Sequence, residues 1–234
     1  CSSAASDVYK RQVMSETNYN NLAVKKRRIL GPLGRFLMKL FRWDIKGEIP
    51  DLRKMILIGL PHTAMRDAWY ALLAVWSLDL KINFFGAAWI FTRLPSLFTI
   101  SKNLDRLGVP WPFWWLQKYL LLKLGGIPVY RVNSKGLIYG AVEEFKKIDN
   151  YILVIAPEAG TEPVSEFRSG FYYLAKGLNI PLVPIAIDFK NRCFSIRQYY
   201  FVKGTFEEES QKLVDQFKGV QGATRVFKML EKTE

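Results

Sequence analysis

The chain has 234 residues, half of them hydrophobic, and a formal net charge of +13 from 34 Lys and Arg against 21 Asp and Glu. That length is enough for one sizeable core, and no change of composition marks a linker between two domains. The positive charge favours an anionic partner: nucleic acid, an anionic bilayer or a phosphorylated substrate. Cys193 is the only cysteine besides Cys1, so a disulfide framework is excluded.

The aromatic residues narrow the choice of anionic partner. Seven Trp and 16 Phe are clustered along the chain, which suits the boundary between lipid headgroups and acyl chains. The sequence has no zinc-finger spacing, no aromatic RNP-type strand and no basic zipper. We therefore expect an anionic membrane surface as a partner and no nucleic acid.

The N-terminal part divides into two segments. Residues 1–13 lack a long apolar run, and we expect them to be non-native or disordered, with Met14 as the natural start. Residues 14–48 form a basic segment with an amphipathic helix over 30–43, which is either packed on its own domain or lies at a membrane interface. The apolar side chains that share one face of this helix are Leu33, Phe36, Leu37, Leu40 and Phe41.

From residue 54 onward, apolar runs alternate with helical patterns, as is typical of an α/β domain. Strands are expected at 54–60, 81–86, 125–131, 151–157, 180–188 and 192–202. Helices are expected at 64–77, 135–148, 167–178 and 207–232, the last of them broken by Gly219 and Gly222. We therefore predict a single α/β domain over 49–234, with a mixed, largely parallel central sheet flanked by helices.

One apolar stretch, residues 87–126, does not fit this alternation. Arg93, Pro95 and Lys102 interrupt it, so no window reaches the roughly 20 apolar residues that a spanning helix needs. Its later part, "PWPFWWLQKYLLLK", mixes Trp, Tyr and Lys as membrane-interface anchors do. We expect a peripheral membrane protein on the cytoplasmic face; the alternative is that these aromatics fill a core.

His62, the only histidine, follows the first of these strands, and Asp67 comes five positions later. Within one continuous helix, five residues at about 100° each would leave the two side chains about 140° apart. If Thr63 caps the helix, His62 precedes the cap and Asp67 is the fourth helical residue, so the two form a polar version of a hydrophobic staple. Asp67 would then fix the imidazole tautomer and leave the other ring nitrogen as a base. A histidine satisfied in the core or on the surface is the alternative.

Further blocks follow the His-x4-Asp pair in a set order: "GGIPVYR", "APEAGT" and "IPLVPIAID". The series, over about residues 55–190, resembles the glycerolipid acyltransferase family of the 1-acyl-sn-glycerol-3-phosphate acyltransferase type. In this resemblance "GGIPVYR", ending in Arg131, matches the second or third block, and "APEAGT" matches the Pro-Glu-Gly-Thr-Arg block through Glu158. The combination is far more specific than any one block.

The resemblance has one departure, in the block around Glu158. The family's block reads Glu-Gly-Thr-Arg, whereas the residues after Glu158 here read Ala-Gly-Thr-Glu. In the family, that arginine is thought to bind the phosphate of the acceptor. Here the resemblance implies that Arg131 and Arg168 would bind it instead. The implied substrate-binding residues are Arg131, Glu158, Gly160, Thr161 and Arg168.

The resemblance implies transfer of a fatty acyl group from acyl-CoA or acyl-carrier protein to a lysophospholipid hydroxyl, above all that of 1-acyl-sn-glycerol-3-phosphate. His62 is the implied general base, Asp67 orients it, and backbone amides at 63–65 are candidate oxyanion donors. No metal or cofactor is expected beyond the acyl donor as co-substrate, since one histidine and one cysteine in the body of the chain are too few for a typical zinc cluster. Three alternatives stay open: another lipid acceptor, even a non-phosphorylated one, a hydrolase that uses water, and a non-catalytic membrane-binding protein.

Overall fold

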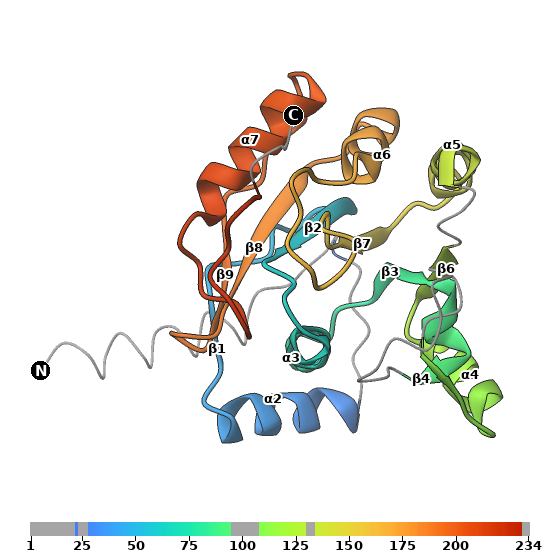
Figure 1. Ribbon diagram of the computed structural model, residues 1–234. Coiled ribbons are helices and arrows are strands. Elements are labelled where there is room, and N and C mark those ends of the chain that lie inside the picture. The colour runs from blue at the N-terminus through green and yellow to red at the C-terminus, as the bar shows by residue number, and fades with distance from the viewer. Residues whose placement is uncertain (1–21, 23–27, 95–107, 130–133, 231–234) are drawn as a thin grey trace, which may run out of the picture.

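The computed structural model describes residues 22, 28–94, 108–129 and 134–230 (Figure 1). The strands of its central sheet are β1 (Asp44–Lys46), β2 (Lys54–Leu60), β3 (Ile82–Ala87), β6 (Gly126–Val129), β7 (Tyr151–Ile155), β8 (Leu182–Asp188) and β9 (Cys193–Ile196). They lie in the order β1-β9-β8-β2-β7-β3-β6. Every neighbouring pair is parallel except β8 and β9, which are antiparallel. The predicted single α/β domain with a mixed, largely parallel sheet is thereby confirmed.

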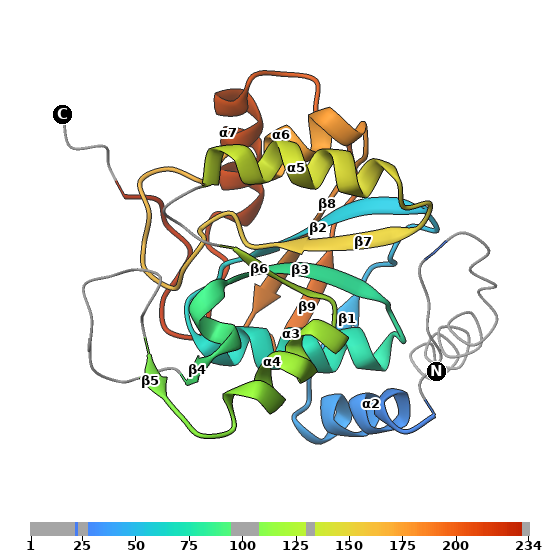
Figure 2. The same ribbon diagram turned by 90° about the vertical axis from the view of Figure 1, so that its right-hand side faces the viewer.

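Helices cover both faces of this sheet (Figures 1 and 2). One face carries α5 (Ser134–Lys146), α6 (Gly170–Leu178) and α7 (Phe206–Phe217), and the other carries α3 (Met65–Ser77), with α2 (Leu30–Leu40) packed on it. The helix α4 (Trp114–Lys123) lies beside β6, next to the short helix η1 (Ala88–Phe91) and the two-stranded sheet of β4 (Arg93–Leu94) and β5 (Val109–Pro110).

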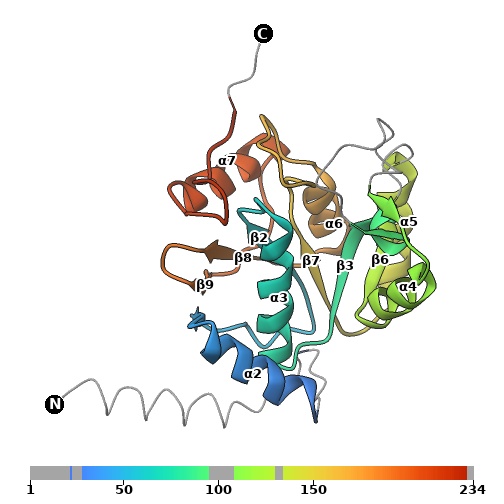
Figure 3. The same ribbon diagram turned by 60° about the horizontal axis from the view of Figure 1, so that its bottom comes forward.

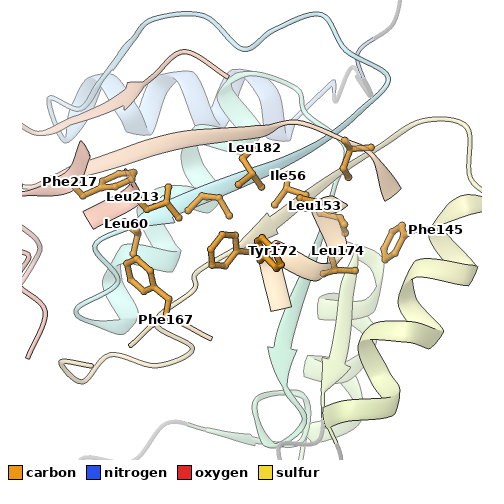
Figure 4. Packing of buried hydrophobic residues seen from close by; sticks show 14 of the residues in the cluster. Ile56, Leu60, Phe145, Leu153, Phe167, Tyr172, Leu174, Leu182, Leu213 and Phe217 are labelled. Carbon is orange, nitrogen blue, oxygen red and sulfur yellow. The ribbon is translucent and has the colours of Figure 1, made fainter. Parts of the chain in front are cut away.

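The strand β2 explains why the core has two halves. Successive side chains of a strand point to opposite faces, and a strand that is buried on both faces reads as a continuous apolar run. Ile56, Ile58 and Leu60 join the larger cluster beneath α5, α6 and α7 (Figure 4), whereas Met55 and Leu57 join the cluster on the opposite side. The apolar run from Met55 to Leu60 therefore holds the central strand between two helical layers.

The predicted amphipathic helix forms, but it packs through small residues. Gly31 and Gly34 are buried, and a Cβ on Gly34 would lie 2.7 Å from the backbone nitrogen of Ser77, so the missing side chains let α2 approach α3 closely. Figure 3 shows α2 lying across the C-terminal end of α3. The large hydrophobic side chains that are exposed on α2 and its C-cap are Leu33, Phe36, Leu40 and Phe41. Four of the five side chains of the predicted apolar face thus point away from the domain.

The helix expected at 207–232 is shorter than predicted. It ends at Phe217 as α7, and Gly219 has a φ of +80°, a left-handed conformation that favours glycine. Residues 218–230 are not helical, and an isolated β-bridge joins Gln221 to Val226. This segment returns towards the start of α3. The strand β1 was not predicted, because three residues of mixed polarity give no periodic signal.

No helix among the described residues has both the length and the apolar character needed to cross a membrane.

Candidate active site

Two of the predicted site residues meet because of the sheet topology. β2 and β7 are parallel neighbours, with Ile58 opposite Ile155, so the residues that follow each strand lie at the same edge. His62 follows β2 and Glu158 follows β7. Open α/β sheets bind their ligands at this carboxyl edge, in the crevice outside the strand ends.

Asp67 joins the helix start to the imidazole of His62. Its carboxylate is fully buried, and Oδ2 accepts hydrogen bonds from the backbone N–H of Thr63 at 2.5 Å and of Ala64 at 2.8 Å. Nδ1 of His62 lies 3.5 Å from the same oxygen. An anion in the first turn of a helix is also stabilised by the helix dipole. The carboxylate is therefore held rigidly by the backbone, with the imidazole beside it.

The cap of α3 differs from the prediction. Ala64, not Thr63, is the N-cap residue, so α3 begins at Met65 and Asp67 is its third residue instead of its fourth. The reason is that Asp67 reaches back to the Ala64 N–H, which an acidic side chain at the third position is placed to do. The bonds to Asp67 also engage the Thr63 and Ala64 N–H groups, so these two amides do not serve as the expected oxyanion donors.

The His62 side chain remains accessible from the solvent. About a fifth of its surface is exposed, at 21%. Because Nδ1 faces Asp67, Nε2 is the ring nitrogen left for a reacting group. At 3.5 Å the contact is longer than a strong charge-assisted hydrogen bond, so Asp67 orients the imidazole chiefly by electrostatics.

Glu158 holds the backbone of His62 in place. Its Oε2 accepts a hydrogen bond from the His62 N–H at 2.5 Å, and the side chain is almost fully buried. Burial raises the pKa of this carboxyl above its ordinary value, while the His62 N–H and the guanidinium of Arg225 lower it. The net effect is a raised pKa. The Glu158 side chain links the segment after β7 to the backbone of His62.

The loop after Glu158 is strained at one position. Ala159 has a φ of +53°, a left-handed conformation that costs a residue with a Cβ about 1–2 kcal/mol, and glycine is the residue that adopts it freely. Gly160 faces open space, since an added Cβ would meet nothing within 4 Å. The Thr161 carbonyl accepts a hydrogen bond from Arg225 Nη1 at 2.5 Å.

The two arginines expected to replace the missing cation are placed differently. Arg131 lies outside the described residues. Arg168 is exposed, and its backbone N–H donates to the Pro157 carbonyl at 2.9 Å, so its backbone is tied to the Glu158 loop. Of the seven predicted site residues, His62 contacts two others: Asp67 through its imidazole and Glu158 through its backbone N–H.

Sequence reasoning missed the segment 222–225, which we call the C-terminal strap. Thr224 donates its N–H to Thr63 Oγ1 at 3.2 Å and its hydroxyl to the Thr63 carbonyl at 3.0 Å. Arg225 Nη2 lies 3.6 Å from Glu158 Oε1. Arg66, in the first turn of α3, donates to the Ala223 carbonyl. The available signal was the pair Gly219 and Gly222, which argued against a continuous helix but did not say where the chain would go next.

Within the described part of the chain, no group of three or more His, Cys, Asp or Glu side chains gathers in a way that could hold a metal ion.

Comparisons with known proteins give one structural likeness. No family model and no curated protein matches this chain. Among solved structures, the chain is similar to the 1-acyl-sn-glycerophosphate acyltransferase PlsC from Thermotoga maritima, with 13% sequence identity and a TM-score of 0.47 over 91% of this chain and 82% of that one. A likeness at this level decides nothing about chemistry, which has to be judged from the residues of the site.

Proposed function

We propose that the protein is an O-acyltransferase that moves a fatty acyl group from acyl-CoA or acyl-carrier protein to the hydroxyl of a lysophospholipid, with 1-acyl-sn-glycerol-3-phosphate as the first candidate acceptor. The observation that supports this best is the accessible imidazole of His62 beside the buried carboxylate of Asp67, at the carboxyl edge of the sheet. The order of the four sequence blocks is the second support.

In the proposed reaction, Nε2 of His62 removes the proton from the acceptor hydroxyl, and Asp67 stabilises the imidazolium that results. The freed oxygen attacks the carbonyl carbon of the thioester, and a new C–O bond forms. The tetrahedral intermediate then expels the thiolate as the C–S bond breaks. The imidazolium returns its proton to the sulfur, so the products are an ester and a free thiol.

Attachment to an anionic membrane surface, on the cytoplasmic face, is part of the proposal. Leu33, Phe36 and Leu40 of α2 are exposed. So are four side chains of α4: Trp114, Trp115, Tyr119 and Leu120. Both helices lie at the lower end of the molecule in Figures 1 and 2. Aromatic and apolar side chains of this kind partition into the headgroup region, and a net charge of +13 attracts anionic lipid.

The test is acyl transfer from labelled acyl-CoA to a panel of lysolipids, with wild-type protein and His62→Ala. We expect ester product from the wild type and a loss of at least about 10²-fold in the variant, which removes the general base. Equal thermal unfolding of both proteins is the control for folding. Undiminished turnover by His62→Ala would contradict the proposal.

The same assay separates the alternatives. Free fatty acid released from acyl-CoA without any lysolipid would favour a hydrolase. Equal use of monoacylglycerol and lysophosphatidate would favour a non-phosphorylated acceptor. Salt-sensitive vesicle binding without turnover would favour a non-catalytic membrane protein.

A further inference from the structure

The loop at residues 158–162, the Glu158 loop, contains acidic side chains and no basic one. Residues 158–162 read Glu-Ala-Gly-Thr-Glu, so this stretch carries two carboxylates and no Lys or Arg. A phosphate-bearing acceptor bound here would meet negative charge unless a cation came from elsewhere in the chain. Arg225 reaches this loop from a segment more than sixty residues later, as its 64-residue separation from Thr161 records.

The contacts of Arg225 leave part of its guanidinium available. Nη1 donates to the Thr161 carbonyl at 2.5 Å, while Nη2 is 3.6 Å from Glu158 Oε1, which is beyond hydrogen-bond length. A guanidinium carries five N–H donors, more than these two neighbours use. A quarter of the side chain is exposed. The group is therefore oriented by the loop and still open to a ligand.

The position of this guanidinium relative to His62 suits an acceptor that spans the two. The Glu158 carboxylate accepts from the His62 backbone N–H through Oε2 and faces Arg225 through Oε1, so one carboxylate lies between the His62 backbone and the guanidinium. A glycerol phosphate carries its free hydroxyl and its phosphate on neighbouring or nearly neighbouring carbons. An acceptor whose hydroxyl reaches His62 needs a cation for its phosphate nearby, and Arg225 is the guanidinium that shares the Glu158 carboxylate with His62.

The C-terminal strap fixes the backbone that presents Arg225. The Gly222 N–H donates to the Arg225 carbonyl at 2.9 Å and closes a turn. Thr224 makes two hydrogen bonds to Thr63, the residue that follows His62. Because the same short segment contacts both the helix start and the Glu158 loop, the cation and the base are held in one frame, which lowers the ordering cost when an acceptor binds.

We propose that Arg225 is the phosphate-binding residue of the acceptor site, delivered by the C-terminal strap to a loop that has no cation. This inference rests on the proposed acyltransferase function and makes it more specific, because it selects acceptors that carry a phosphate. A guanidinium binds phosphate through paired N–H donors, which the ammonium of lysine cannot reproduce.

The test compares Arg225→Gln, Arg225→Lys and the control Lys228→Gln, which removes the same charge from an exposed residue just beyond the strap. We expect Arg225→Gln to raise KM for lysophosphatidate about tenfold or more, and to leave KM for acyl-CoA and turnover of monoacylglycerol within about twofold of wild type. Arg225→Lys should recover part of the loss, and Lys228→Gln should match wild type. A merely structural role would reduce the use of both acceptors alike, and that result would overturn the proposal.

A binding measurement keeps the inference separate from turnover. Titration with 1-hexanoyl-glycerol 3-phosphate should show about tenfold weaker binding to Arg225→Gln than to wild type. If the wild type transfers no acyl group, the proposed function fails while this titration still decides the role of Arg225. Equal affinity for both proteins would overturn it. Should Arg225→Gln prove unfolded, the same comparison with the charge-preserving Arg225→Lys decides, and unaltered phosphate affinity there would count against paired recognition.

Discussion

Asp67 occupies the first turn of α3, where its carboxylate accepts two backbone hydrogen bonds and faces the imidazole of His62. The same atom, Oδ2, makes all three contacts. The geometry of the helix start and the orientation of the histidine are therefore coupled: a change that releases the carboxylate from the backbone also releases the imidazole. The spacing of five residues works because the helix begins between the two.

Glu158 gives a pH-dependent test at the residue scale. Burial raises the pKa of its carboxyl, so the folded protein keeps a proton that the unfolded chain has released. The stability contributed by this group is full below about pH 4.5 and is lost as the pH rises through the raised folded value. We expect the free energy of unfolding of wild type, minus that of Glu158→Gln, to fall from about pH 4.5 to about pH 7.5 in urea titrations.

Glu162→Gln is the matched control for that measurement. It removes an exposed carboxylate from the same loop and leaves the contacts of Glu158 with His62 and Arg225 in place. A Glu158→Gln difference that rises with pH would show that the ion pair with Arg225 outweighs the cost of burial.

The sequence predicted some site residues and not others, for physical reasons. His62 and Asp67 were predictable because their contact depends on local helix-start geometry. Glu158 was predicted only from the resemblance of the block "APEAGT", and its place beside His62 follows from the parallel pairing of β2 and β7. Arg225 was not predictable, because its contacts depend on where a non-helical segment returns after α7, and no local periodicity encodes that path.

At the scale of elements, the end of α7 and the C-terminal strap matter most. Long apolar strands and helices such as β2 and α3 were found from their periodicity to within about two residues. The segment after Phe217 keeps scattered apolar residues but turns at Gly219 and packs its buried Phe227 against Phe167 and Phe217. Tertiary packing, and not helix propensity, decides its conformation.

Gly222 of the C-terminal strap packs against Thr63 at the start of α3, so a substitution at Gly222 tests this contact. A Cβ added there would lie 2.6 Å from Thr63 Cγ2 and 2.8 Å from its Oγ1. Thr63 is tied to Thr224 and Asp67, so it has little room to yield. We expect Gly222→Ala to lower the free energy of unfolding by about 1–3 kcal/mol, measured in denaturant, and to lower acyl transfer with it.

Gly140→Ala is the control for that substitution. An added Cβ at Gly140, on the exposed side of α5, meets nothing within 4 Å. Because alanine is more favourable than glycine in a helix interior, Gly140→Ala should raise the free energy of unfolding by about 0.5–1 kcal/mol. If Gly222→Ala were as stable as wild type, the close fit between the strap and Thr63 would be disproved.

At the scale of the whole molecule, the alternation of apolar runs was sufficient to predict the α/β class, because each run had to be buried between two helical layers. What periodicity could not decide was which face of the first helix is buried. Gly34 packs against the last turn of α3 and Gly31 against Asp79 just beyond it, and the apolar stripe is left outside, since a close approach of two helices needs small residues more than large apolar ones. An exposed apolar stripe on a chain of charge +13 is typical of a surface that contacts a partner, and the proposed partner is an anionic bilayer.

The vesicle test follows from this exposed stripe. Wild-type protein should bind vesicles that contain anionic lipid, and binding should weaken as salt is raised, because surface charges are screened. Phe36 and Leu40 are 61% and 59% exposed, so Phe36→Ser with Leu40→Ser removes apolar area that the bilayer would bury. At about 25 cal/mol per Å² of apolar surface, this double change should weaken partitioning at least about tenfold, as measured by vesicle sedimentation.

Tyr173→Ser is the control. Tyr173 is 51% exposed on α6, on the opposite face of the sheet, so this change should leave partitioning unchanged. Equal losses in the two variants would mean that the protein has no preferred membrane face, and no loss in the double variant would remove α2 from the binding surface.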